Sequence, residues 1–188
     1  SAIALPSLHM ITVKSLGGRA INVDVNGTTV SAFPKEADAN AMISLLGAPE
    51  EEVTKGTVSW PGEYDIGGVS IRGIGHDEGQ RVSYVIDDGK VRIAFISSPL
   101  HDWSGKNLEL LGDVDILCIP ADDVKIAQKL IDEVDPRVLV PLPTKDEATF
   151  VELLKTVGAQ EKEIEAEYKL KGGLPAEGRE VVILKPSK

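Results

Sequence analysis

The sequence has a single cysteine, three histidines and no long apolar run, and each shortage excludes a class of protein. One cysteine, Cys118, rules out an intrachain disulfide and a zinc site built from several cysteines. Because Cys118 lies inside an apolar run over residues 114–120, we interpret it as a buried thiol. No apolar stretch reaches the roughly 20 residues that a membrane-spanning helix needs, so membrane insertion is not expected. We therefore expect a cytoplasmic protein.

Positive charge is also scarce, with 20 Lys and Arg against 30 Asp and Glu and a formal net charge of −10 at pH 7. Such a chain repels phosphate backbones, and no basic cluster offsets the repulsion, so a nucleic-acid partner is not expected. An unidentified protein or a second copy of the chain remains open as a partner. At 188 residues and 42% hydrophobic composition, the chain can bury one core and is expected to form one domain.

The first nine residues differ from the rest of the chain. Regular strand patterning begins at Ile11, and His9-Met10 is what a common cloning site encodes, so residues 1–9 are interpreted as a tag or leader remnant. A trimmed organelle-targeting peptide is the competing interpretation, which would change the compartment but not the fold. Residues 10–188 are the predicted domain.

The first half of the chain is rich in short β-segments. Residues 20–25 and 28–33 flank Asn26-Gly27, a pair typical of the type I′ turn of a β-hairpin. Residues 37–46 are predicted to be helical and to end at Gly47. Further β-segments follow at residues 64–74, 81–86 and 90–96, which predict an antiparallel meander.

The second half changes to longer periods. Residues 114–119 form a continuous apolar run, as a strand buried on both faces should. Residues 124–134 carry a helical apolar stripe, residues 137–142 predict a second buried strand, and residues 146–157 repeat the helical period. This alternation implies parallel pairing through right-handed crossovers.

This order resembles the metallo-β-lactamase superfamily, and most closely its small branch of predicted Zn-dependent hydrolases of the β-lactamase fold. Residues 61–69, Pro-Gly-Glu-Tyr-Asp-Ile-Gly-Gly-Val, are similar to a Pro-Gly-Glu-Tyr-Glu-Ile-x-Gly-Val signature of that branch. Residues 11–18, 92–94, 111–117 and 136–141 also fall in the family's order and spacing. The resemblance implies an α/β fold, a four-layer αββα sandwich with two mixed β-sheets and outer helices.

The resemblance also implies a metal site, and this chain departs from the family at nearly every ligand position. The main ligand motif, His-x-His-x-Asp-His, is absent, and residues 35–58 contain no histidine. Phe33 stands where the family has the Asp of an Asp-Pro pair, Ser97-Ser98 where it has Gly-Asp, and Pro143 where it has its last metal histidine. Because a catalytic zinc ion uses three protein ligands, we expect neither a metal nor another cofactor.

One ligand-like residue, His76, remains in the resemblance. His76-Asp77 matches a His-Asp pair that contributes a metal ligand in the family, so His76 is either a vestigial ligand or a loop histidine paired with Asp77. The family's counterpart of His101 is not a primary ligand, and an orienting or solvent-exposed role is expected for it.

Two functions follow from these residues. The predicted one is a non-catalytic scaffold or binding module, a degenerate member of the family that has lost its metal ligands. The alternative is a metal-dependent hydrolase with a remodelled site around His76 and His101. A serine nucleophile at Ser97 or Ser98 with His101 as its base is disfavoured, because no Gly-x-Ser-x-Gly turn surrounds them and no orienting third group is identifiable.

Overall fold

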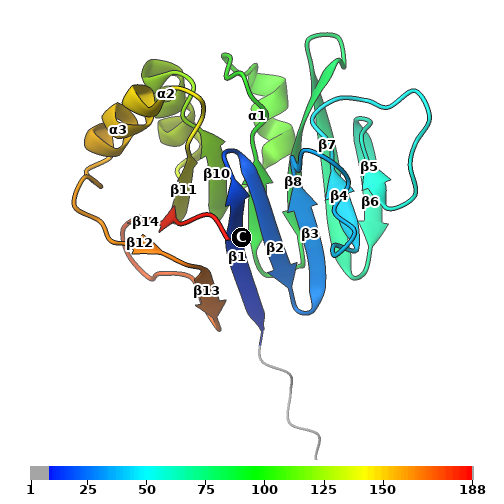
Figure 1. The fold of residues 1–188 in the computed structure, drawn as a ribbon, viewed down its shortest axis with the longest axis horizontal. Helices are drawn as coiled ribbons and strands as arrows, with labels where there is room; N and C mark the ends of the chain where they lie inside the picture. Colours follow the sequence, from blue (N-terminus) through cyan, green and yellow to red (C-terminus); the bar gives the residue numbers. More distant parts are fainter. Residues whose placement is uncertain (1–8, 188) are drawn as a thin grey trace, which may run out of the picture.

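The computed structural model describes residues 9–187, which form two β-sheets packed face to face and a layer of helices (Figure 1). The interpretation of residues 1–9 as a remnant therefore falls almost wholly outside the described residues. His9 itself contacts the fold, since its Nε2 atom lies 2.5 Å from Oδ2 of Asp88.

The first sheet is built around the predicted N-terminal hairpins. Asn26 and Gly27 both have positive φ, 51° and 93°, which confirms the type I′ turn. The first and last strands that the sequence contributes to this sheet meet near one of its edges, where Met10 is opposite Lys171. The strand order is β13 (Tyr168–Lys171), β1 (Met10–Gly17), β2 (Ala20–Val25), β3 (Thr28–Ala32), β4 (Ile43–Leu45) and β5 (Thr57–Val58).

The helix predicted over residues 37–46 is wrong. This segment makes turns and then forms strand β4, which pairs in parallel with β3. Asp38 explains the difference, because its carboxylate accepts hydrogen bonds from the backbone N–H of Asn40 and from the hydroxyl of Ser31. Ser44 in turn accepts from the backbone N–H of Asp38. Such local side-chain bonds offer the backbone an alternative to the helix.

The second sheet confirms the predicted meander and the predicted parallel units. Strands β6 to β9 pair antiparallel in sequence, and β9, β10, β11 and β14 pair in parallel. The strand order is β14 (Glu180–Val181), β11 (Val138–Leu142), β10 (Ile116–Pro120), β9 (Arg92–Phe95), β8 (Arg81–Asp87), β7 (Val69–His76) and β6 (Gly62–Ile66). A small separate pair joins β12 (Ile164–Glu165) to β15 (Ile183–Leu184).

Three helices lie on the outer face of the second sheet: α1 (Gly105–Leu111), α2 (Val124–Val134) and α3 (Glu147–Thr156). Figure 1 shows α2 and α3 packed over β10 and β11. Each helix begins after a residue whose side-chain oxygen accepts a backbone N–H three residues on, namely Ser104, Asp123 and Asp146. The expected α/β fold of two mixed sheets with outer helices is therefore confirmed, although the helices of residues 9–187 cover the second sheet and not both sheets as a four-layer αββα sandwich requires.

The outer face of the first sheet carries polar side chains instead. Along β1, Ile11 and Val13 are fully buried, whereas Thr12 and Lys14 between them are not. An antiparallel sheet can leave one face in water when its residues alternate in this way. Among residues 9–187, no helix is long and apolar enough to cross a membrane.

Two apolar cores result, one between the sheets and one between the second sheet and the helices. Cys118 lies in the first core and is 1% exposed, and burial raises the pKa of its thiol. Tyr84, also in this core, places its hydroxyl 2.5 Å and 2.9 Å from the carbonyl oxygens of Leu46 and Val58. The hydroxyl thereby ties the first sheet to the second.

Candidate functional site

The site residues singled out from the sequence lie at the ends of strands. His76 ends β7, Ser97 follows β9, and Pro143 follows β11. These three strands run in the same direction, because β9 and β11 both pair in parallel with β10, and β7 is separated from β9 by one antiparallel strand. Their ends therefore meet at one edge of the second sheet, which is where open α/β sheets place their sites.

Four of the side chains at this edge form a hydrogen-bonded chain, which we call the His–Ser cluster: His76, Ser83, Ser97 and His101. The Oγ atoms of Ser97 and Ser83 are 3.0 Å apart, and Ser83 Oγ lies 3.0 Å from His76 Nε2. His76 Nδ1 lies 3.1 Å from Nε2 of His101. His76, Ser83 and Ser97 are all at least 96% buried.

His76 is neutral at pH 7 in this environment. Its pKa is lowered to about 4, mainly by burial and in smaller part by electrostatic repulsion from His101 and Arg81. A neutral imidazole offers one donor and one acceptor, and both have partners when Nε2 donates to Ser83 and Nδ1 accepts from His101. Ser83 Oγ also accepts from the backbone N–H of Ser97, which leaves its own proton for Ser97 Oγ. The polar side-chain atoms of His76, Ser83 and Ser97 thus all have partners within the cluster.

Trp103 closes one side of the His–Ser cluster. Its ring lies 4.6 Å from the His76 ring at an interplanar angle of 62°, and 6.2 Å from the His101 ring in a stacked arrangement. Trp103 is 8% exposed. Within residues 9–187, Trp103 Nε1 and His101 Nδ1 are buried without a hydrogen-bond partner. Aromatic packing therefore holds the two imidazoles in place from this side.

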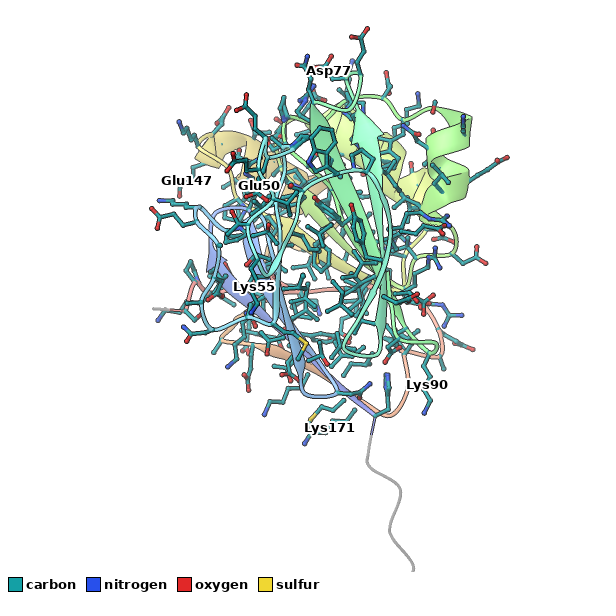
Figure 2. All side chains as sticks on the ribbon, turned by 90° about the vertical axis from the view of Figure 1, so that its right-hand side faces the viewer. Glu50, Lys55, Asp77, Lys90, Glu147 and Lys171 are labelled. Carbon is teal, nitrogen blue, oxygen red and sulfur yellow. The ribbon has the colours of Figure 1, made fainter. Side chains whose placement is uncertain are left out.

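The expected pairing of His76 with Asp77 is wrong, as is the description of His76 as a loop residue. The Asp77 side chain is 61% exposed and its nearest cation is Arg81, with 3.9 Å between Oδ2 and Nη2. Asp77 has a φ of 52° and begins the turn after β7, so its side chain leaves the sheet. Figure 2 shows Asp77 projecting from the top of the molecule.

The remaining site residues gather around the turn between β1 and β2. The Arg19 guanidinium lies 5.9 Å from the centre of the Phe33 ring and donates to the carbonyl oxygen of Ser98 over 3.4 Å. A Cβ placed on Gly18 would lie 4.0 Å from the carbonyl oxygen of Pro143. Phe33, Ser98 and Pro143 therefore border one region, to which Arg19 brings a positive charge.

Phe33 is held in an unusual backbone conformation. It is 6% exposed and has a φ of 54°, which costs a bulky residue free energy. Its ring lies 6.1 Å from the Tyr84 ring and would be 3.4 Å from a Cβ on Gly47. The ring thus packs into the core between the sheets, which offsets the backbone cost.

The serines do not form a nucleophile with His101. Ser98 Oγ donates to Asp122 Oδ2 over 2.6 Å, and the same oxygen accepts from the backbone N–H of Leu100. Ser97 reaches an imidazole only through Ser83. A serine nucleophile needs its base within direct hydrogen-bond reach. Neither serine meets that requirement.

Few side chains that could bind a metal ion lie close together among the described residues. Over residues 9–187, no group of three or more His, Cys, Asp and Glu side chains is placed to hold a metal ion. His76 Nδ1 and His101 Nε2 are 3.1 Å apart, a spacing that suits a shared proton and also two ligands of one ion. Two ligands are one fewer than the three that a catalytic zinc ion takes from the protein.

Several residues of the site were missed from the sequence: Arg19, Ser83, Trp103, Asp122 and Asn107, whose Nδ2 atom lies 3.5 Å from Nδ1 of His76. Ser83 carried a usable signal, because it interrupts the apolar residues Val82, Tyr84 and Val85. A hydroxyl in a buried strand needs partners, and finding one there predicts a polar neighbour. The other four carried no comparable signal.

Comparisons with known proteins identify a family and several solved structures of similar fold. A family model described as a β-lactamase superfamily domain matches residues 15–143. A proposed Zn-dependent hydrolase of the metallo-β-lactamase superfamily from Thermotoga maritima is similar in structure, with a TM-score of 0.75, 19% identity, and coverage of 93% of this chain and 98% of that one.

Two further solved structures are similar at lower scores. A metallo hydrolase from Ignicoccus hospitalis has a TM-score of 0.62 and 12% identity, and the match covers 95% of this chain and 97% of that one. A proposed metal-dependent hydrolase from Parabacteroides distasonis has a TM-score of 0.61 and 15% identity, with 95% and 94% covered. At these identities the likeness shows the fold. No curated protein matches the chain.

Proposed function

This chain belongs to the β-lactamase superfamily, and we propose that within it the chain is a non-catalytic scaffold or binding module whose metal ligands have been replaced. The observation that carries the proposal is the His–Ser cluster. Its side chains hydrogen-bond to one another, and both ring nitrogens of His76 have partners in the cluster without an ion. In the described part of the chain, Nδ1 of His101 is the cluster atom left without a partner. A metal site would instead aim its free ligand atoms at a common point.

The charges around the cluster support the same proposal. Carboxylates that converge on a metal site repel one another unless a cation is bound. By the resemblance to the family, Phe33 and Pro143 replace two metal ligands, and Arg19 brings a fixed positive charge beside Phe33 and Ser98. A cation entering this region would meet that charge. Asp122, the nearby carboxylate, already accepts two hydrogen bonds from Ser98 and Leu100.

The proposal is tested by the metal content of protein purified without chelators. We expect zinc, manganese and iron each far below one ion per chain by inductively coupled plasma mass spectrometry. A ligand that binds only the folded state raises the melting temperature. Because we expect no zinc to bind, the melting temperature should be the same with and without added zinc. His9→Ala is the matched control for histidine removal outside the cluster. One tightly held ion per chain that His76→Ala removes and His9→Ala does not would contradict the proposal.

A metal-dependent hydrolase with a remodelled site is the second candidate, and one observation favours it. His76 and His101 place two ring nitrogens 3.1 Å apart, and His76 is in the neutral form that binds metals. Hydrolysis of chromogenic lactam, ester and phosphodiester substrates should be measured with zinc and manganese added. Metal-dependent turnover lost in both His76→Ala and His101→Ala would place this function first.

A further inference from the structure

Strand β6 is one of the two edge strands of the second sheet, and Figure 2 looks onto the side of the molecule where it lies. The β6–β7 hairpin has a two-residue turn, Gly67-Gly68, with φ of 59° and 80°. In such a hairpin the hydrogen-bonded pairs alternate from Ile66–Val69 onward, so the backbone groups of Glu63 and Asp65 point away from β7. Among residues 9–187, no other segment forms a backbone hydrogen bond with them.

A groove of about 540 Å³ runs along the outer face of the sheet beside this edge. The strand register places Asp65, Ser70, Asp87 and Arg92 in one row across it. The charged residues that line the groove are four acids and two bases, a formal charge of −2: Glu63, Asp65, Asp87, Asp88, Arg72 and Arg92.

Both arginines of the groove are already engaged. Arg72 pairs with Glu63 and donates to the carbonyl oxygen of Leu110 over 3.3 Å. Arg92 pairs with Asp87 over 2.9 Å and donates to the carbonyl oxygen of Leu111 over 2.7 Å. They thus hold the C-terminal end of α1, where cations are stabilising.

Asp65 is the acid of the groove left without a basic partner. In the described part of the chain its hydrogen-bond partner is the Ser70 hydroxyl, at 2.8 Å, and no salt bridge reaches it. Since Asp65 also carries one of the outward-facing backbone N–H groups, negative charge and free hydrogen-bonding groups coincide on the same residue. This edge therefore favours a partner that brings positive charge and an extended backbone.

The opposite side of β6 is apolar. Tyr64 and Ile66 turn inward and pack against the core between the sheets. Two exposed apolar side chains flank the ends of the strand: Trp60, 48% exposed, precedes it, and Met42, 53% exposed, lies beside Gly67, where an added Cβ would be 2.7 Å from its sulfur. A strand laid along β6 would present one set of side chains to the acidic groove and the alternate set to these apolar groups.

We propose that β6 docks an extended segment of a partner protein in which basic and apolar residues alternate, and that this segment adds to the second sheet as a further strand. The proposal rests on the binding-module function above and names its partner. A second copy of the chain fits poorly, because antiparallel pairing of β6 with itself places Glu63 or Asp65 opposite another acid. A basic segment places opposite charges there and is attracted by the chain's net charge of −10.

The test uses the full chain and an acetylated, amidated octapeptide of alternating Lys and Val, with binding measured by titration calorimetry and by Trp60 fluorescence. A Glu-Val octapeptide is the charge control. Two further peptides carry N-methyl groups on alternate amides, one on the set that faces β6 and one on the opposite set. We expect the Lys-Val peptide to bind, the Glu-Val peptide not to bind, and methylation of the facing set to weaken binding at least tenfold while methylation of the other set changes it little.

Two measurements on the protein complete the test. Amide exchange at Glu63 and Asp65 should slow when the Lys-Val peptide is bound. Asp65→Asn should weaken binding about two- to fivefold, and less at high salt, as expected for a partly exposed charge pair. Asp132→Asn, which removes the same charge from helix α2, should leave the affinity unchanged.

The proposal is overturned if the Lys-Val peptide does not bind at millimolar concentration, if the two methylated peptides bind equally, or if amide exchange at Glu63 and Asp65 is unaffected. Its failure is distinct from failure of the non-catalytic function. A metal-free chain that does not bind the peptide loses the docking surface alone. If the chain binds the peptide and also holds a catalytic metal, the docking proposal stands and the proposal of a non-catalytic function fails.

Discussion

Acidification should destabilise the fold through His76. The pKa of this ring is about 4 in the folded protein, whereas the ordinary pKa of histidine is 6.5, so the unfolded chain takes up the proton at a higher pH. The contribution of neutral His76 to stability is therefore fully present above pH 6.5 and is lost as the pH falls from there towards 4. At about 1.4 kcal/mol per pH unit, the loss between pH 7 and pH 5 is about 2 kcal/mol.

Urea unfolding of the wild type and of His76→Gln at pH 7, 6 and 5 measures this loss. Glutamine cannot take up the proton, so the stability difference between the two proteins should shrink by about 2 kcal/mol from pH 7 to pH 5, while the carboxylates contribute equally to both. The chemical shift of the His76 ring proton should show no titration above pH 5. A constant stability difference, or a ring that titrates near pH 6.5, would refute the reasoning and imply that water reaches the cluster.

Two further changes address the residues beside the cluster. Phe33→Ala should lower the free energy of unfolding by about 3 kcal/mol in urea titrations, because the ring is 6% exposed and leaves a cavity. Phe33→Asp should also lower the free energy of unfolding, although the new carboxylate could pair with Arg19. The double variant Phe33→Asp, Arg19→Ala should therefore lose more stability than the sum of the two single changes, and a gain in stability of Phe33→Asp on adding zinc would contradict this account. Tyr84→Phe should cost about 1–3 kcal/mol in thermal unfolding, because the buried carbonyl groups of Leu46 and Val58 lose the one proton that the hydroxyl donates, and a neutral result would mean that water replaces it.

Much of the fold could be predicted because its strands carry strong local patterns. The alternation of apolar and polar residues before Phe33 predicts a half-buried strand. The apolar run around Cys118 predicts a strand that is buried on both faces. The segment from residue 37 to 46 has no such pattern. Its alanines favour a helix, but Asp38 hydrogen-bonds to neighbours that are only placed once β3 and β4 have paired.

The candidate site could be predicted only in part. Matching to the family motifs located Phe33, Ser98 and Pro143, which the structure places around the same turn. The partner of His76 could not be predicted in this way, because adjacency in sequence suggested Asp77. Ser83 becomes its neighbour through the pairing of β7 with β8, where Ile74 is opposite Ser83, and such register depends on the whole sheet.

The pairing of β1 with β13 has a consequence for synthesis of the chain. Hairpins β1–β2 and β2–β3 can form as soon as Ala32 has been made, yet the outer edge of β1 has no partner until Lys171 has been added. At about 5–20 residues per second, the ribosome leaves that edge open for roughly ten seconds or more. An open edge of this kind is where nascent chains join one another. Lys14, which projects from β1 and pairs with Glu167 only in the finished sheet, places a charge on the strand during that interval.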